Sequence, residues 1–522
     1  MMESTPIISL YWVWPVLLLV GYTAGTAMSR RLSEARCVFP VVGKPFAFAP
    51  RFISNLAFAF NATNLIQQGY AKFKHEAFQL IRSTGNMIIL PHNLLEELST
   101  IPPTIASPYK ALEHDLLGAY TGLDLILESR LHHTIVQRKL TPRLGLITPG
   151  LQEELAAAFD EELPTSEDWR EFQPYQCIGK IAARLSARAI VGPAFCKDPT
   201  WLDISFNYTE NLFRTIVFLR MFPPFLHSVV CPLIPAYWKC NYYIRLAKQL
   251  LVPRIRELIS QNDKGTWAPK STEEDTNVLH WMIDSVKGRD RDPHVLAHIE
   301  VLLALASVHT TLLRMVNVLY DITASNDGLV EELRHEISSV AGDSKGWDVA
   351  SYDALHKLDS VLRESQRMSP PTTLGLKRFF TEAYTFQDGT RVPKGAYVCL
   401  PIHAIENDPE ITPNPEIFDG LRSYRMSKPM LTNQDKNSGK EYLFSSPTPI
   451  TLNFGYGKSA CPGRFFASLI VKMVFVKILT EHDFKFLPAT GRPSNLMVHE
   501  FLFSSPWQRM LLKKKKYSAC PF

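Results

Sequence analysis

The sequence predicts a mainly α-helical protein with a small β part, preceded by one N-terminal transmembrane helix. Three observations support this prediction. Most of the chain after residue 45 places apolar side chains three and four residues apart, which is the spacing of an amphipathic helix. Only the short region of residues 384–400 alternates more strictly and holds two turn sequences. Residues 7–28 contain no charged side chain.

The uncharged segment of residues 7–28 is long enough to cross a bilayer as a helix of roughly 20 residues. Glu3 precedes it, whereas Arg30, Arg31 and Arg36 follow it. Because positive charge marks the cytosolic end of a membrane span, we expect a retained anchor with the remaining chain in the cytosol. A cleaved signal peptide is the alternative, but its basic start and small-residue cleavage site are not evident.

The expected organisation is a membrane anchor over residues 1–29, a basic and Pro/Gly-containing hinge over residues 30–45, and one folded domain over residues 46–522. A long apolar helix over residues 293–322, with Asp292 as its N-cap, is expected in the middle of this domain. Further helices are expected at residues 123–140, 151–163, 178–191, 242–260 (kinked or divided at Pro253), 352–368 and 464–480, and a small hairpin within residues 384–400.

Composition argues against two classes of protein. Lys and Arg exceed Asp and Glu by only five, which is too small a basic excess for a nucleic-acid binder. The eight cysteines lack paired metal-site spacing and are too sparse for a disulfide scaffold, so a reducing compartment fits best. The run Lys513 to Lys516 is interpreted as a solvated tail, or alternatively as a contact with anionic lipid or an acidic partner.

A decapeptide near the C-terminus, from Phe454 to Gly463, is the most informative part of the sequence. It reads FGYGKSACPG and places Cys461 in a glycine-rich turn. A thiolate that binds iron needs a turn whose backbone N–H groups temper its charge; Gly457 and Gly463 permit such a turn, and Phe454 can cover the sulfur. A cysteine in a glycine-rich loop is by itself more often structural. The full spacing Phe-x-x-Gly-x-x-x-Cys-x-Gly, followed by a helix-like segment, favours a metal ligand.

This spacing resembles the haem-binding loop of the cytochrome P-450 superfamily, and the resemblance covers about residues 40–510. It implies the P-450 fold and a catalytic domain over residues 46–522, with haem b held by Cys461 as the axial thiolate ligand of the iron. The chain departs from the family at Ser459, where most members have a His or Arg that contacts a haem propionate. Because a hydroxyl brings no positive charge, haem retention or redox potential is expected to differ.

The second family signature, Glu-x-x-Arg on a helix, is matched by Glu364 and Arg367. Residues three apart share a helix face, so the two can form an ion pair that a third residue, Arg422, joins. Arg422 matches the family's Phe-x-x-x-Arg stretch only in part. Glu331 and Arg334 have the same spacing on a helix expected to be exposed, so position along the chain selects the first pair. The resemblance gives this network a structural role in supporting the haem site.

The third signature lies on the long helix, where Thr310 resembles the distal threonine that takes part in proton delivery to oxygen. His309 stands where most members have Asp or Glu, and it is either a proton relay or a core histidine. His133 and Arg138, on the expected helix of residues 123–140, are candidates for contact with a haem propionate, although the family's Trp-x-x-x-Arg is missing. Ordinary surface placement is the alternative for both.

The resemblance implies a monooxygenase that uses O₂ and electrons from an NADPH-dependent reductase, at the endoplasmic reticulum membrane. Short segments around His309-Thr310-Thr311, His403 and Phe418 are similar to fungal members that oxidise terpenoids and indole diterpenes. The expected substrate is therefore a hydrophobic small molecule, a terpenoid or terpenoid hybrid. A haem-thiolate isomerase or dehydratase that uses no O₂, and a haem protein that senses or carries, are the rival interpretations.

Overall fold

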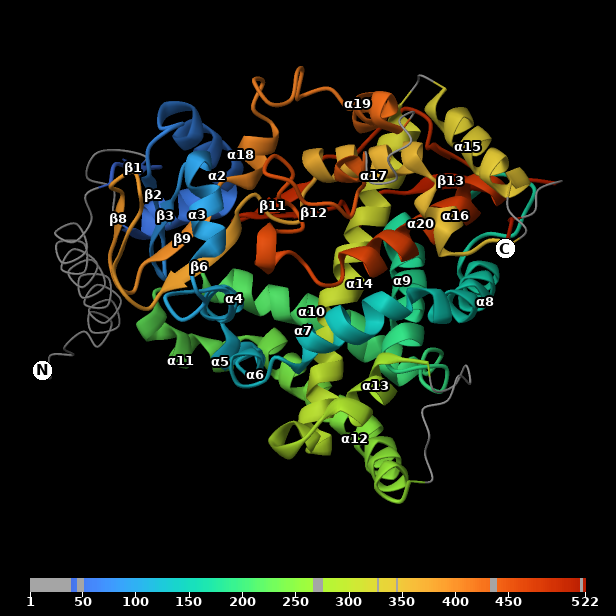
Figure 1. The fold of residues 1–522 in the computed structure, drawn as a ribbon, viewed down its shortest axis with the longest axis horizontal. Helices are drawn as coiled ribbons and strands as arrows, with labels where there is room; N and C mark the ends of the chain where they lie inside the picture. The colour runs from blue at the N-terminus through green and yellow to red at the C-terminus, as the bar shows by residue number, and fades with distance from the viewer. Residues whose placement is uncertain are drawn as a thin grey trace, which may run out of the picture.

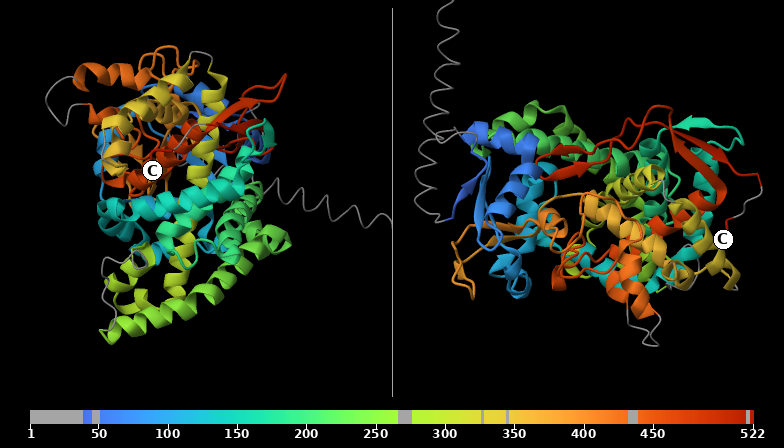
Figure 2. Two further views of the ribbon diagram at one scale, coloured as in Figure 1. Left: turned by 90° about the vertical axis from the view of Figure 1, so that its right-hand side faces the viewer. Right: turned by 90° about the horizontal axis from the view of Figure 1, so that it is seen from above.

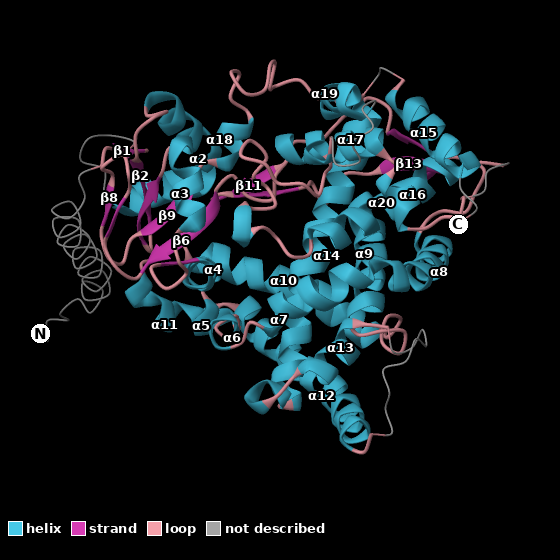
Figure 3. Ribbon diagram, in the orientation of Figure 1, coloured by secondary structure: helices cyan, strands magenta, loops and turns pink. Residues whose placement is uncertain are grey.

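The structure is a computed structural model, and it describes residues 39–44, 51–265, 276–325, 328–343, 346–431, 439–516 and 520–522. Helices make up most of the molecule, and most strands gather at one end of it (Figure 3). The expected anchor over residues 1–29 and most of the expected hinge lie outside the described residues. The predicted fold class, mainly α with a small β part, is confirmed for the described chain.

The helices vary in length from one turn to nearly nine. They are α2 (Arg51–Lys72), α3 (Leu95–Thr100), α4 (Pro108–Leu116), α5 (Gly118–Thr121), α6 (Leu125–Glu128), α7 (Leu131–Ile135), α8 (Leu144–Glu162), α9 (Pro174–Ile190), α10 (Pro199–Leu219), α11 (His227–Val230), α12 (Pro235–Asp263), α13 (Val278–Ser285), α14 (Pro293–Ala324), α15 (Leu329–Asp343), α16 (Val349–Asp353), α17 (His356–Met368), α18 (Ile402–Glu406), α19 (Arg422–Leu431) and α20 (Arg464–Glu481).

The strands form one larger sheet and three small ones. The larger sheet has the order β1-β2-β3-β9-β6-β4, and α2 packs against it. The strands are β1 (Val41–Val42), β2 (Phe78–Arg82), β3 (Gly85–Ile89), β4 (Ala106–Ser107), β5 (Arg170–Phe172), β6 (Gly375–Phe380), β7 (Tyr384–Thr385), β8 (Arg391–Val392), β9 (Tyr397–Leu400), β10 (His482–Phe486), β11 (Leu496–Val498), β12 (Phe501–Phe503) and β13 (Met510–Lys514). Among the described residues the buried apolar side chains form three clusters: a large one among the helices, one at the larger sheet, and a small one around Leu219 and Ile234, near the end of α10 and the start of α12.

Helix α14 runs through the middle of the molecule, as the sequence predicts (Figures 1 and 2). The carboxylate of Asp292 accepts a hydrogen bond from the His294 backbone N–H at 2.8 Å, and Pro293 occupies the first helical position. Helices α9, α10, α12, α17 and α20 pack around it. Among the described residues, α14 is the one single helix long and apolar enough to span a membrane, but two thirds of its most apolar stretch is buried inside the protein.

Several element boundaries differ from the sequence-based expectation. Helix α12 continues through Pro253 as one helix. The helix expected at residues 352–368 is divided into α16 and α17, because the Glu336 carboxylate accepts the Lys357 and Leu358 N–H groups at 2.6 and 3.0 Å and so starts a new helix there.

Two strand-forming regions, residues 384–400 and the segment around Lys513, also differ from expectation. Within residues 384–400 only β7 and β8 form the expected hairpin, whereas β9 joins the larger sheet. The interpretation of Lys513 and Lys514 as tail residues is wrong, because both belong to β13, which pairs with β10.

Candidate active site

The loop that carries Cys461 is built around two glycines with left-handed backbone conformation. Gly455 has a φ of +76°, and a Cβ there would lie 2.7 Å from the Ser459 carbonyl oxygen. Gly457 has a φ of +58°. The Cys461 N–H then closes the loop by donating to the Phe454 carbonyl at 2.7 Å. Gly463, expected to contribute to the turn, has a φ of −87°, which other residues also adopt.

The surroundings of the Cys461 sulfur combine burial, which favours the neutral thiol, with hydrogen-bond donors that favour a thiolate. Burial raises the pKa of the Cys461 thiol, while backbone N–H groups of Gly463 and Arg464 and the charge of Arg464 act in the opposite direction. These donors belong to the first turn of α20, where the helix dipole also favours negative charge. The Phe454 ring packs edge-on against Phe444, with ring centroids 5.1 Å apart. The loop therefore presents one sulfur with donors already directed at it.

Ser459 is exposed and accepts a hydrogen bond from Arg378 Nη2 at 2.9 Å. Arg378 lies on β6 and is only 3% exposed, and burial lowers the pKa of its guanidinium to about 10. Its other hydrogen bond goes to the Lys377 carbonyl, and it forms no ion pair with any carboxylate of the described chain. A buried guanidinium of this kind suits an acidic group of a ligand. No motif marks Arg378 in the sequence.

The predicted ion-pair network is assembled as expected. Arg367 donates to both Glu364 oxygens, from Nε at 3.0 Å and from Nη2 at 2.7 Å. Arg422 Nε lies 3.2 and 3.3 Å from the same two oxygens. The departure at Gly420 has a steric reason, because a Cβ there would lie 2.8 Å from a methyl group of Leu329.

Two residues that the sequence analysis missed connect this network with the Cys461 loop. Arg367 also donates to the side chain of Asn407. The neighbouring Glu406 is 3% exposed, and its carboxylate accepts the Leu452 N–H at 2.5 Å and the Asn453 amide at 2.8 Å. Leu452 and Asn453 directly precede Phe454. The ion-pair network thus reaches the loop through two adjacent residues: Asn407 contacts the network, and Glu406 contacts the segment before the loop.

The other pair with the same spacing, Glu331 and Arg334, has a different environment. The two form an ion pair at 2.7 Å on α15, and Glu331 is 72% exposed, as expected for a surface pair. Arg334 is more buried than expected, because it also contacts Asp483 and the carbonyls of Leu479 and His482. This pair fastens α15 to the end of α20 and has no contact with the Cys461 loop among the described residues.

The middle of α14 is accessible at Ala306 and Thr310, although the helix around them is buried. The Thr310 hydroxyl donates to the Ala306 carbonyl at 2.7 Å, which leaves its lone pairs available to accept hydrogen bonds. His309 lies on another side of the helix, where its ring packs at a tilt against Phe206 of α10, with ring centroids 4.8 Å apart. Burial lowers the pKa of His309 to about 4, so this residue is a neutral imidazole in an aromatic environment.

His133 and Arg138 lie in α7 and in the turn that follows it, beside the Cys461 loop. A Cβ on Gly463 would contact Val136 at 3.9 Å, and the Thr141 hydroxyl donates to the Pro462 carbonyl at 3.3 Å. Arg138 is exposed, and burial lowers the pKa of the half-buried His133. The segment therefore packs on the loop, while neither side chain forms a hydrogen bond or an ion pair with the loop in the described part of the chain.

The donor set fits a haem. The cysteine sulfur with its N–H donors suits an iron-bound thiolate. Arg378 and Ser459 can hold a propionate, and the accessible Ala306 and Thr310 leave room beside α14.

Comparisons with known proteins agree with this geometry. A family model described as cytochrome P450 matches residues 124–512. The cytochrome P450 monooxygenase AN1598 of Emericella nidulans is 35% identical over 477 residues, which cover 91% of this chain and 88% of that protein. An ent-kaurene oxidase of Fusarium fujikuroi is 31% identical, with coverage of 98% and 95%. The monooxygenase paxP of Penicillium paxilli is 32% identical, with coverage of 92% and 91%.

A solved structure shows the same fold at low sequence identity. The retinoic acid-bound cyanobacterial CYP120A1 superposes with a TM-score of 0.64 at 19% identity, covering 92% of this chain and all of that one. The fold, the loop around Cys461 and the family match therefore agree, and the chain belongs to the cytochrome P-450 family of haem-dependent monooxygenases.

Proposed function

We propose that this monooxygenase oxidises a hydrophobic secondary metabolite, a terpenoid or terpenoid hybrid, with electrons from an NADPH-dependent reductase. Haem b, bound through Cys461, supplies the activation of O₂ and the transfer of one oxygen atom to the substrate. The observation that carries the proposal is the Cys461 loop, with its sulfur held beside the N–H groups of Gly463 and Arg464. Arg378 and Ser459 bind a propionate, and Glu364, Arg367 and Arg422 support the loop.

Thr310 is proposed to hold a water molecule beside α14, through which it would deliver protons in the oxidation reaction. Its hydroxyl donates to the helix carbonyl of Ala306, so its oxygen can accept a hydrogen bond from water on the accessible side of α14. The close packing of the His309 ring against Phe206 supports the core interpretation of this histidine over a relay role. An isomerase or dehydratase has no need for Thr310 in this place.

The substrate proposal rests on an aromatic wall and on one relative. Phe213 of α10 meets Phe501 and Phe503 of β12 edge-on, with ring centroids 5.5 and 5.7 Å apart. The Ser504 hydroxyl donates to the Leu313 carbonyl at 3.1 Å, so this wall is attached to α14 one turn beyond Thr310. Such a surface suits an apolar, rigid molecule. The relative named for ent-kaurene supports the terpenoid class.

Membrane association, with the catalytic domain 46–522 on the cytosolic face of the endoplasmic reticulum, is supported by exposed apolar side chains. These side chains lie near the start of α2 and at the connection between α10 and α12. The Asn55 side chain joins the two regions by donating to the Arg220 carbonyl at 2.9 Å. The exposed residues are Phe52, Ile53, Phe218, Phe225, Val229, Leu233 and Trp238.

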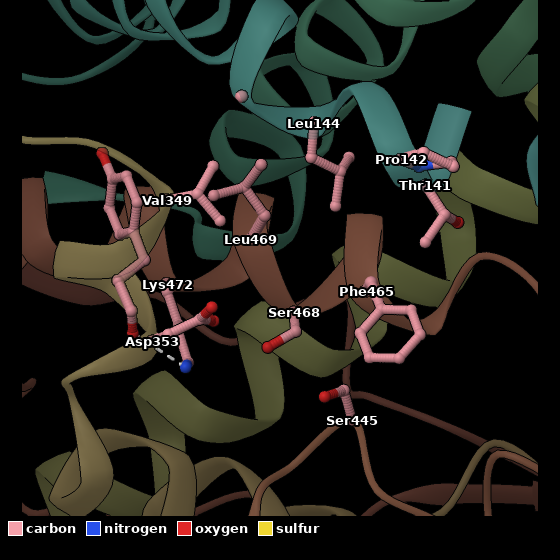
Figure 4. Close-up of a pocket in the computed structure, with 12 residues that line it drawn as sticks. Thr141, Pro142, Leu144, Val349, Asp353, Ser445, Phe465, Ser468, Leu469 and Lys472 are labelled. Carbon is pink, nitrogen blue, oxygen red and sulfur yellow. Dashed lines mark hydrogen bonds between the residues drawn. The ribbon is translucent and has the colours of Figure 1, made fainter. Parts of the chain in front are cut away.

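The reductase is proposed to dock on the side of the molecule where the Cys461 loop reaches the surface. A cavity of about 290 Å³ opens there between the start of α8, α16 and α20, lined by Leu144, Val349, Phe465 and Leu469 among others (Figure 4). Arg138 and Lys458 are exposed in the segments next to it. Basic side chains beside an apolar hollow suit an acidic electron donor.

Optical titration of the haem protein with ent-kaurene, followed by turnover with NADPH and a fungal reductase, tests the proposal. We expect a shift from low to high spin and an oxidised product. Fatty acids serve as the comparison. If they give the shift and the product while ent-kaurene gives neither, the terpenoid assignment is wrong. Conversion of a substrate without O₂ or NADPH consumption would instead establish an isomerase or dehydratase.

A further inference from the structure

Five charged side chains from five elements meet in the interior, beside the aromatic wall. Arg220, at the end of α10, donates to Glu500 at 3.1 Å and lies 3.3 Å from Asp115 of α4. Lys377 of β6 lies 2.5 Å from Asp115 and 3.3 Å from Glu500. Arg82 of β2 completes the charge cluster, 3.1 Å from Asp115. None of these residues belongs to the haem motifs.

The charge cluster is buried and unbalanced. The side chains of Arg82, Asp115, Arg220 and Glu500 are at most 4% exposed, and that of Lys377 is 17% exposed. Burial by itself raises the pKa of Glu500, but Arg220, Lys377 and Arg82 hold it well below its usual range. Three cations therefore face two carboxylates. Desolvated charges of this kind hold their geometry closely, because separating them leaves a buried charge without a partner.

Phe501 connects the charge cluster with the aromatic wall. The Arg220 guanidinium carbon and the Lys377 ammonium nitrogen lie 5.1 and 5.5 Å from the centroid of its ring. The same ring meets Phe213 and Phe503 edge-on or tilted, at 5.5 and 6.4 Å. Glu500 forms the turn between β11 and β12, and its carbonyl accepts the Thr373 N–H at 2.8 Å. Figure 1 shows this hairpin beside α14.

We infer that the buried charge cluster sets the position of the Phe213–Phe501–Phe503 wall, and that Glu500 and Arg220 are positioning residues for the selection of bulky ligands. The inference rests on the proposed function only in taking the Thr310 side of α14 as the side where ligands bind. One carboxylate of the cluster fastens the hairpin, and one arginine fastens α10. Their mutual attraction therefore fixes the distance between the two halves of the wall.

Glu500→Gln tests this inference, with Glu154→Gln as the matched control. Glu154 of α8 is also a buried carboxylate, 5% exposed, paired with the 3% exposed Arg184 at 2.5 Å, and it belongs to the α8–α9 side of the helical core. Two ligands that coordinate haem iron through an azole nitrogen serve as probes, imidazole and the bulky triaryl compound clotrimazole. Imidazole is the small probe and clotrimazole the bulky one, so a change in the wall should affect clotrimazole binding more than imidazole binding. Dissociation constants are measured from the shift of the Soret band.

We expect Glu500→Gln to weaken clotrimazole binding at least tenfold and to leave imidazole binding unchanged. Glu154→Gln should lower the urea midpoint of unfolding by about as much as Glu500→Gln does. It should change neither the clotrimazole nor the imidazole dissociation constant. If Glu500→Gln loses stability like the control and keeps the ratio of the two constants, the charge cluster is only structural and the inference fails.

Phe501→Leu carries the test if Glu500→Gln does not fold, since it leaves all five charges in place. Phe501→Leu should raise the ratio of the clotrimazole to the imidazole dissociation constant, as Glu500→Gln does. An unchanged ratio would overturn the inference. The two proposals fail separately. A wild-type protein that binds both azoles and oxidises no terpenoid refutes the proposed substrate, while the ratio still decides the role of the charge cluster.

Discussion

Replacement of Glu364 by glutamine is the sharpest test of how the haem site is supported. The Glu364 carboxylate is 2% exposed and accepts two hydrogen bonds from Arg367, at 2.7 and 3.0 Å. It also accepts the Arg422 Nε–H at 3.2 Å and the Asp419 N–H at 3.2 Å. Glutamine keeps the length of the side chain and one acceptor oxygen, but it turns an NH₂ group toward a guanidinium. Arg367 and Arg422 then lose the carboxylate that they share.

The expected cost follows from the burial of the pair. Removing one partner of a buried ion pair costs about 3–5 kcal/mol, because the remaining charge stays desolvated. Glu331→Gln is the matched control, since Glu331 pairs with Arg334 at the same spacing and the same distance of 2.7 Å but is 72% exposed. An exposed pair contributes about 0–1 kcal/mol. The two variants should therefore differ by at least about 2 kcal/mol in the free energy of unfolding.

The measurements are urea unfolding and the haem content of the purified protein, read from the absorbance of the reduced CO complex. Glu364→Gln should be recovered largely without haem, since Arg367 also binds Asn407, whose neighbour Glu406 binds the residues before the Cys461 loop. Glu331→Gln should retain haem in full. Equal stability losses in the two variants, or a normal haem content in Glu364→Gln, would refute the reasoning.

Four further predictions concern single residues of the site. Cys461→His should abolish the red-shifted, thiolate-type band of the reduced CO complex, and its persistence would identify another residue as the ligand. Thr310→Ala should consume NADPH but release more peroxide per product, whereas unchanged coupling would remove Thr310 from proton delivery. Arg378→Leu should release haem faster to apomyoglobin than the wild type, because Ser459 alone brings no charge to a propionate; equal release rates would contradict this role. Burial raises the pKa of Glu406 to about 7, from an unfolded value of 4.5. Its contribution to stability, on the order of 3 kcal/mol, is therefore present below pH 4.5 and is lost as the pH rises to 7. Glu406→Gln should flatten this slope in urea unfolding, and an unchanged slope would show that Glu406 titrates alike in the folded and unfolded protein.

The sequence predicted those parts of the site whose members are close along the chain. Cys461 and the glycines before it share one turn, and Glu364 and Arg367 share one helix face, so spacing alone reveals them. Spacing also located α14 and its cap at Asp292. It was less informative at helix α17, because the carboxylate that starts this helix comes from a different helix.

Arg378, Glu406 and Asn407 had no signal in the sequence, since each acts through partners tens of residues away. Arg378 meets Ser459 from another element, and Asn407 meets Arg367 across 40 positions of the chain. A buried charge is recognised only after burial is known, and burial is a property of the packed elements. For the same reason the sequence did not show that Phe206 would cover the ring of His309, which is the contact that favours the core interpretation.

By itself, then, the sequence determined the fold class, the central helix and the cysteine loop, because each depends on periodicity or on the conformational freedom of nearby glycines. The charge cluster around Arg220 and Glu500 was decided only by the tertiary structure. Its members are separated by up to several hundred positions and lie on five elements. Local patterns specify which face of a helix or strand is apolar, but the charges that meet behind those faces depend on how the elements pack against one another.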